Sequence, residues 1–349
     1  MTINKCFLSL FESNESYMIF KYLQGHYLIF CLLTLAGPSL LAQDSTTTKR
    51  PNFVEGEIQN DAFYIRLRTD RYFTSGLSLK LQTDAFTDGL LGFGAIFPLQ
   101  FQDKGAENYY QLQIVHQLFS PYEISWTDPS VMDRPYAAVA SLRFSNQTVL
   151  SHSSLILKKE IQLGWVGPSL NGEMSQNTLH QMIGRPTAQG WDYQIADGIV
   201  YGLNFGLEKG LRTKQWDPET QSSWLLELNS ECSNLSAKLE AGLNYQLGNN
   251  QTYFAPAPLP HHRLQWYVYF KALVQLAAYN QLIDGHLSPS NDGVLLQPNP
   301  LQHLLVRGDY GIVIQLRNWE CQLSYQFLSP EIKGASAHYW GSIRLRRYF

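Results

Sequence analysis

The chain has 349 residues and a formal net charge of −3, and 16% of its residues are charged while 13% are aromatic. The slightly negative charge argues against nucleic acid as a partner, because domains that bind nucleic acid carry an excess of Lys and Arg. Few charges and many aromatic residues are typical of strands with one apolar and one polar face, and less so of a solvated globule.

In chain order, the first predicted element is a leader over residues 1–42. Lys5 and Lys21 precede an apolar run over 27–35, which is shorter than the roughly 20 apolar residues that a membrane-spanning helix needs. We interpret the leader as a secretory signal that is cleaved after its last residue, rather than as an uncleaved anchor. The remainder, 43–349, is expected to form one domain.

The strongest pattern beyond the leader is strict alternation. From 235 to 247, every odd position is Leu, Ala or Tyr, and every even position is Ser, Lys, Glu, Gly, Asn or Gln. The pattern returns over 266–276 and 306–317. Strands of soluble sandwiches usually run to about six residues, so alternation over ten or more predicts strands that cross a bilayer at a tilt.

The sequence contains twelve segments of this kind, and single-chain bacterial barrels have an even number of strands. The predicted strands cover 52–60, 73–83, 108–118, 136–147, 156–166, 198–208, 222–230, 234–247, 264–279, 304–317, 319–327 and 338–349. The predicted fold class is therefore all-β, a transmembrane antiparallel β-barrel of about 12 strands in a bacterial outer membrane. The last strand ends in Tyr348-Phe349 and resembles the signal that the outer-membrane insertion machinery reads, so this machinery and the lipid bilayer are expected partners.

With both termini in the periplasm, the connections from odd to even strands face outside. The predicted extracellular loops are 61–72, 119–135, 167–197 and 280–303. Within the third loop, the apolar positions of Glu173–Ile183 predict a short amphipathic helix laid against the barrel rim.

Three polar clusters meet at this rim in the predicted topology. Asn60-Asp61 ends the first strand, Thr74 lies at the start of the second, and Gln176 and His180 lie on the loop helix. Because Gln176 and His180 are four residues apart, a helix presents both on one face. Their convergence predicts a functional site.

Around these positions the chain resembles the lipid A 3′-O-deacylase (LpxR-like) family of outer-membrane proteins. The motifs that carry the resemblance are, in chain order, Asn60-Asp61 with Phe63, Thr69–Gly76, Asp133–Ala137, Val166–Ser169, Gly172-Glu173, Gln176-Asn177 with His180, Ile183-Gly184, Gly190–Asp192 and Gln194. They cover about half of the mature chain.

The resemblance implies a calcium-dependent esterase that removes the 3′-acyloxyacyl group of lipid A, the anchor of lipopolysaccharide, at the outer leaflet. By motif, His180 would be the general base, a role suited to a side chain that titrates near neutral pH. Gln176, Thr74 and Asn60 would complete the catalytic set around the ester. Asp61 would bind Ca²⁺ together with Asn60, because calcium prefers oxygen ligands, and zinc stays a second candidate because histidine also suits zinc.

The chain departs from the family pattern at two places. Where some relatives carry an acidic residue after the loop helix, this chain has Arg185-Pro186, so Glu173 or Asp192 would have to supply that carboxylate to the metal. Some relatives also carry a lysine in the second extracellular loop, where only Arg134 is close in this chain.

Each candidate residue also has a structural interpretation. Asn60-Asp61 could form a turn or a helix cap, His180 could be a polar residue of a loop helix, and Thr74 an ordinary strand residue. Arg134 and its neighbours are interpreted as an ion pair and a strand start, and Trp191 as an anchor of the loop or of the membrane interface.

Other functions remain open at this point. One is a catalytically inactive barrel of the same family with a structural or surface-binding role, and another is a porin, which would have a constricting loop and an open charged lumen. A third is a phospholipase, which would use a Ser-His arrangement that has no local signature here. The chain is expected to be a monomer, and Cys232 and Cys321 either form a disulfide or stay free.

Overall fold

The computed structural model describes residues 52–63, 71–88, 106–249, 254, 264–286 and 301–349. The predicted leader, with Lys5 and Lys21, lies outside the described residues, as do Thr69 and Asp70 of the second motif.

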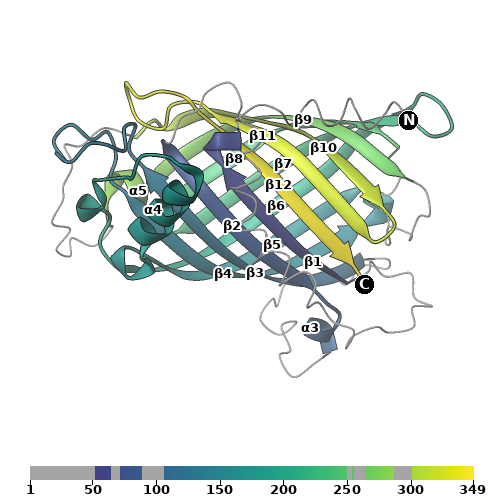
Figure 1. The fold of residues 1–349 in the computed structure, drawn as a ribbon. Coiled ribbons are helices and arrows are strands. Elements are labelled where there is room, and N and C mark those ends of the chain that lie inside the picture. The colour runs from purple at the N-terminus through teal and green to yellow at the C-terminus, as the bar shows by residue number, and fades with distance from the viewer. Residues whose placement is uncertain (1–51, 64–70, 89–105, 250–253, 255–263, 287–300) are drawn as a thin grey trace, which may run out of the picture.

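The described residues form a closed barrel of twelve strands, each antiparallel to its neighbours, as the alternation predicts (Figure 1). Strands β1 and β12 pair and close the sheet. The strands are β1 (Phe53–Asn60), β2 (Tyr72–Gln82), β3 (Ala106–Ser120), β4 (Ala137–Leu150), β5 (Leu155–Val166), β6 (Gly198–Gln215), β7 (Gln221–Ser233), β8 (Ser236–Gly248), β9 (Gln265–Asn280), β10 (Leu304–Leu316), β11 (Trp319–Leu328) and β12 (His338–Tyr348).

Short helices lie in the connections at both ends of the barrel. The α-helices are α3 (Ala85–Asp88), α4 (Gly172–Ile183) and α5 (Gln281–Asp284), and the 3-10 turns are η2 (Asp61–Phe63), η4 (Ser151–Ser153), η5 (Pro168–Leu170) and η6 (Trp191–Tyr193). Figure 1 shows α4 and α5 together at one end, opposite the end that carries α3 and the C-terminus. Within the described part of the chain, no helix is both long enough and apolar enough to cross a membrane.

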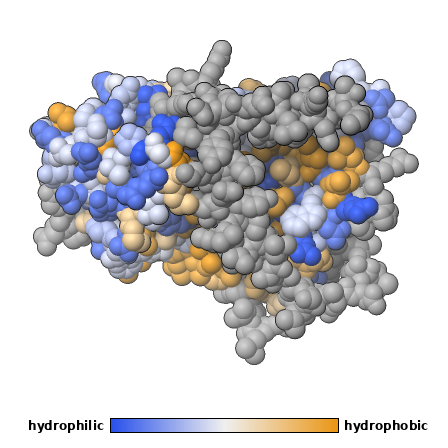
Figure 2. Space-filling view, in the orientation of Figure 1, coloured by the Kyte–Doolittle hydropathy of each residue, from blue (hydrophilic) through white to orange (hydrophobic). Residues whose placement is uncertain are grey.

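The two faces of the wall differ as the alternation predicts. On β8, Leu239 and Leu243 are exposed on the outside, whereas Glu240 and Asn244 are buried in the lumen. Figure 2 shows hydrophobic residues over the strands and hydrophilic residues over the end that carries α4. An apolar outer band between polar ends is the surface of a barrel that spans a bilayer.

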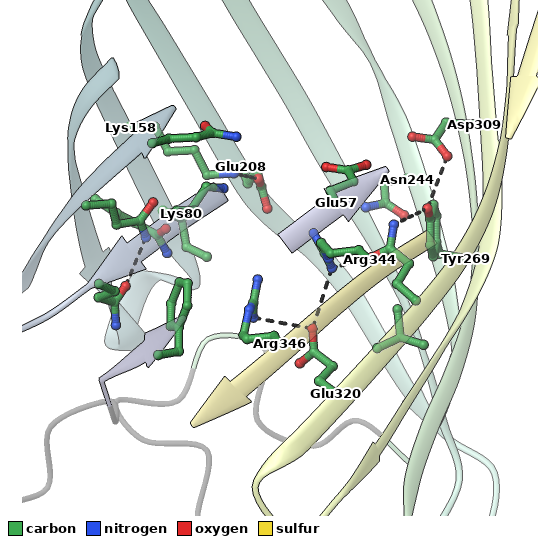
Figure 3. A pocket seen from close by; sticks show the side chains of 18 of the residues that line it. Glu57, Lys80, Lys158, Glu208, Asn244, Tyr269, Asp309, Glu320, Arg344 and Arg346 are labelled. Atoms are coloured by element: carbon green, nitrogen blue, oxygen red, sulfur yellow. Dashed lines mark hydrogen bonds and ion pairs between the residues drawn. The ribbon is translucent and has the colours of Figure 1, made fainter. Parts of the chain in front are cut away.

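The lumen holds a cavity of about 490 Å³ lined by charged and amide side chains. Its charges neutralise one another: Arg346 Nη1 lies 3.3 Å from Glu320 Oε1, and Lys271 Nζ lies 2.8 Å from Glu227 Oε1, as the dashed lines around Glu320 in Figure 3 illustrate. The first pair joins the neighbouring strands β11 and β12, and the second joins β9 to β7, which lie on either side of β8. The charged side chains of the lumen thus stabilise one another. None of the residues predicted to form the site lines this cavity.

Apolar side chains fill the lumen at the end that carries α4. The rings of Phe73 and Phe119 lie 5.6 Å apart, and those of Phe73 and Trp340 lie 5.5 Å apart. Beside them, Val166 and Ile195 belong to one buried cluster from strands and loops. This packing differs from the open, charged lumen expected of a porin.

Cys232 and Cys321 are both free thiols, so the disulfide alternative does not hold.

Candidate functional site

The end of β1 is tied to the start of β2 by its two predicted site residues. Asn60 Nδ2 donates to the Thr74 carbonyl at 2.6 Å, and Asn60 Oδ1 accepts from the Ala62 backbone N–H at 2.7 Å. Asp61 Oδ2 accepts from the Arg71 N–H at 3.0 Å. Asn60 and Asp61 are buried. The turn interpretation of this pair is therefore correct, and both side chains carry oxygen atoms of the kind that a hard cation binds.

Thr74 lies in an irregularity of β2. Phe73 pairs with Phe119 and Ser75 pairs with Leu118, so Thr74 has no partner on β3. Such a bulge re-aims a side chain that regular alternation would send to the other face. As a result, Thr74 Oγ1 lies 2.6 Å from Ser120 Oγ, at the end of β3.

Helix α4 presents Gln176, Leu179 and His180 to the barrel, and all three are buried. Leu179 packs against Ile58 of β1 in a small apolar cluster. The predicted helix, 173–183, matches α4 to within one residue, and its contact with the rim is confirmed. The spacing of four residues does place Gln176 and His180 on one face.

Gln176 connects α4 to both the loop and the barrel wall. The Trp191 indole Nε1 donates to Gln176 Oε1 at 2.8 Å, and Gln176 Nε2 donates to Ser120 Oγ at 3.2 Å. With the Thr74 contact, this gives a continuous chain of side chains, Trp191, Gln176, Ser120 and Thr74. Trp191 is buried, so it anchors the loop from within rather than at the membrane interface.

His180 is held by the loop that follows its helix. Its Nδ1 lies 2.5 Å from the Pro186 carbonyl oxygen. Because a carbonyl can only accept, the contact assigns the proton of the neutral ring to Nδ1 and leaves Nε2 as the basic nitrogen. Asn177 closes this loop by binding both the N–H and the carbonyl of Ala188, at 2.7 and 3.1 Å.

The network lies on the outer face of the wall. On β1, Glu57 and Gln59 line the lumen, so Asn60 points to the opposite side. On β3, Ser120 has the same parity as Ile114, which is 55% exposed on the outside. A site placed there, between the wall and α4, faces the lipid side of the barrel and not its lumen.

The possible metal ligands around Asp61 suit a hard cation better than a soft one. The carboxylate of Asp61 and the amide oxygen of Asn60 are the oxygen ligands that calcium prefers. Over the described residues, no three His, Cys, Asp or Glu side chains group closely enough to hold a metal ion. Glu173 is exposed in the first turn of α4. Asp61 and Asn60 thus offer oxygen ligands, the kind that a hard cation prefers.

Ser120 has no local sequence signal, because it ends an ordinary alternating strand. Trp191 lies in one of the family motifs, but the motif does not predict its hydrogen bond to Gln176, 15 residues away. The interpretation of Arg134 and its neighbours as an ion pair and a strand start is confirmed, because Arg134 pairs with Glu331 at 3.4 Å and β4 begins at Ala137. The neighbouring Asp133 accepts from the Tyr122 N–H at 2.9 Å.

A family model and one solved structure agree with this architecture. A family model described as outer membrane protein LpxR matches residues 28–349. The solved structure of LpxR from Salmonella typhimurium superimposes with a TM-score of 0.68 at 16% identity, over 85% of this chain and 100% of that one. The beta domain of the Bordetella autotransporter Brka gives a TM-score of 0.44 at 12% identity, over 86% of this chain and 99% of that one. No curated protein matches the chain.

Proposed function

Because this chain belongs to the LpxR family of outer membrane proteins, we propose that it is an esterase that removes the 3′-acyloxyacyl group of lipid A at the outer leaflet of the outer membrane. The observation that carries the proposal is the meeting of Asn60, Thr74 and Gln176, from three separate segments, in one buried network on the outer wall. Lipid A is a membrane lipid, so a site on this face suits it better than a site in the lumen.

His180 is the general base of the proposed reaction. Pro186 holds Nδ1 in the protonated state, so Nε2 removes a proton from water while the water oxygen attacks the ester carbonyl carbon. The tetrahedral intermediate then expels the sugar oxygen, which takes the proton back from Nε2. The carbonyl of Pro186 thus orients the ring where some relatives carry an acidic residue.

Thr74 and Gln176 serve the same step as positioning groups. The bulge turns the Thr74 hydroxyl toward the gap between the wall and α4. Hydroxyl and amide groups that are fixed before the substrate binds stabilise a developing oxyanion without reorganising.

Asp61 and Asn60 would hold Ca²⁺, whose positive charge would polarise the ester carbonyl when the ion is bound. Glu173 would have to turn inward to join them, since it is exposed. A calcium requirement is therefore part of the proposal, and zinc is its alternative.

Mass spectrometry of lipid A from outer membranes that contain the wild type or His180→Ala tests the proposed activity. We expect the wild type to remove the 3′-acyloxyacyl mass from lipid A. His180→Ala lacks the general base, so its rate of deacylation should be lower by roughly 100-fold or more. A chelator selective for calcium should have a similar effect. The control is His152→Ala, because His152 is exposed in the turn at the opposite end of the barrel.

Unchanged lipid A in the presence of folded, inserted wild type would contradict the proposed function. It would favour the alternative of an inactive family barrel that binds other molecules at the surface. Activity that survives calcium removal but is lost on zinc removal would reassign the metal and keep the esterase.

A further inference from the structure

Ser120 is a buried hydroxyl that touches two of the predicted site residues. It is the last residue of β3 and its exposed fraction is 0%. Its Oγ lies 2.6 Å from Thr74 Oγ1 and 3.2 Å from Gln176 Nε2. The bond to Ser120 therefore joins the barrel wall to α4.

The Trp191 indole, at the opposite end of this chain of hydrogen bonds from Thr74, determines which group donates in each bond. The Trp191 indole has an N–H and no acceptor, so the Gln176 oxygen must face it and the Gln176 NH₂ must face Ser120. Ser120 Oγ accepts that bond, which leaves its own proton available to donate to Thr74 Oγ1. In this order each bond polarises the next.

Thr74 depends on this contact more than an ordinary strand residue would. As the bulged residue it has no partner in the β2–β3 ladder. Its carbonyl is held by Asn60 at 2.6 Å, and its hydroxyl by Ser120. If Ser120 donates to Thr74, the Thr74 proton is directed away from Ser120.

We propose that Ser120 is a positioning residue of the hydrolysis, which relays the orientation of Gln176 and Trp191 to the Thr74 hydroxyl and so keeps the proton of Thr74 directed at the ester. The proposal rests on the proposed esterase function. Ser120 does not attack the substrate, because both sides of its hydroxyl are committed to protein groups.

The first test compares rates of lipid A deacylation by purified Ser120→Ala, Thr74→Val and the double variant. Loss of a fixed hydrogen bond of this kind should lower kcat of Ser120→Ala roughly tenfold with little change in KM. If Ser120 acts through Thr74, the double variant should be no slower than Thr74→Val. Ser125→Ala is the control, because Ser125 is an exposed serine of the following loop.

The second test does not need activity. In protein labelled with ¹⁵N-tryptophan, the Trp191 indole resonance should shift in Ser120→Ala although Ser120 does not touch Trp191, because the Gln176 amide between them loses its bond to Ser120 Oγ. Ser125→Ala should leave the resonance in place. Circular dichroism establishes that each variant keeps its barrel.

The outcomes separate the two proposals. A wild type that leaves lipid A intact overturns the esterase function and with it the role of Ser120 in hydrolysis. If the wild type is active, two results overturn the role of Ser120 alone. One is a double variant whose loss of rate is the sum of the two single losses in free energy, and the other is a Trp191 resonance that does not shift in Ser120→Ala.

Discussion

Asp197 holds the point where the long loop returns to the barrel. One carboxylate oxygen accepts from the Trp165 indole at 2.8 Å and from the Ser169 N–H at 3.1 Å, and the other accepts from the Ser169 hydroxyl at 2.7 Å. Partial burial raises the pKa of Asp197, but the bonds from Ser169 and Trp165 outweigh it and hold the pKa below its usual value of 3.8. The loop that carries α4 is thus fastened at its base by a charged group.

The pKa of Asp197 can be measured through the Trp165 indole resonance as a function of pH. Because the folded pKa is lowered, the stabilisation by Asp197 is complete above the unfolded pKa and is lost as pH falls through the folded value. We expect a midpoint below 3.8 in the wild type, and a higher midpoint in Ser169→Ala, which removes one of the bonds to the carboxylate. Equal midpoints would show that the hydroxyl does not stabilise the charge.

Single residues also mark the limit of prediction from sequence. The motifs identify Asn60, Thr74 and Gln176, yet plain alternation along β2 would place Thr74 with Lys80 on the lumen side. The bulge that turns it outward has no sequence signal here, so the contact with Ser120 could not be expected. Backbone irregularities of one residue are set by the packing of neighbouring strands, which a single sequence does not contain.

At the scale of elements, long alternation made the strands predictable. All twelve predicted ranges correspond to observed strands. The largest error is in β6, predicted to end at 208 but reaching Gln215. Beyond 208, the register shifts between Gly210 and Arg212, and the alternating pattern is lost there although the backbone still pairs with β7. Pairing with a neighbouring strand outweighed the local pattern.

Helix α4 approaches the wall at Gly172. A Cβ on this residue would lie 2.5 Å from ring atoms of Trp191 and 2.8 Å from Ala138 Cβ. Gly172→Ala should therefore force the helix or the indole to move, at a cost of about 1 to 3 kcal/mol for overpacking. Because Trp191 orients Gln176, kcat should fall as well.

Urea unfolding and deacylation rates of Gly172→Ala check this prediction. Thr178→Ala is the matched control, because Thr178 is exposed on the same helix. A Gly172→Ala variant with the stability and rate of Thr178→Ala would mean that α4 has room to shift without disturbing the network.

At the scale of the whole molecule, the barrel must close between its first and last strands, and charges in the lumen secure that seam. Glu55 of β1 is 1% exposed and faces cations from both neighbouring strands. Lys80 Nζ of β2 lies 3.3 Å from Glu55 Oε1, and Arg346 Nε of β12 donates to Glu55 Oε2 at 2.8 Å. Arg344, also of β12, lies 3.7 Å from the same oxygen. One carboxylate thus joins three consecutive strands across the closure.

Glu55→Gln should weaken the barrel as a whole, because it removes the buried carboxylate that Lys80, Arg344 and Arg346 share, although the two arginines keep a second carboxylate, that of Glu320. Breaking a buried ion pair by removing one partner costs roughly 3 to 5 kcal/mol. Glu57→Gln, two residues away on the same face but partly exposed, should cost about 1 kcal/mol or less. Urea titration of refolded protein measures both, and the Trp191 indole resonance in ¹⁵N-tryptophan-labelled protein follows the rim separately. If the rim loses structure at the same urea concentration as the strands in Glu55→Gln, the seam and the site unfold as one unit. If Glu55→Gln is no less stable than Glu57→Gln, strand pairing alone closes the barrel and the charges of the lumen contribute little.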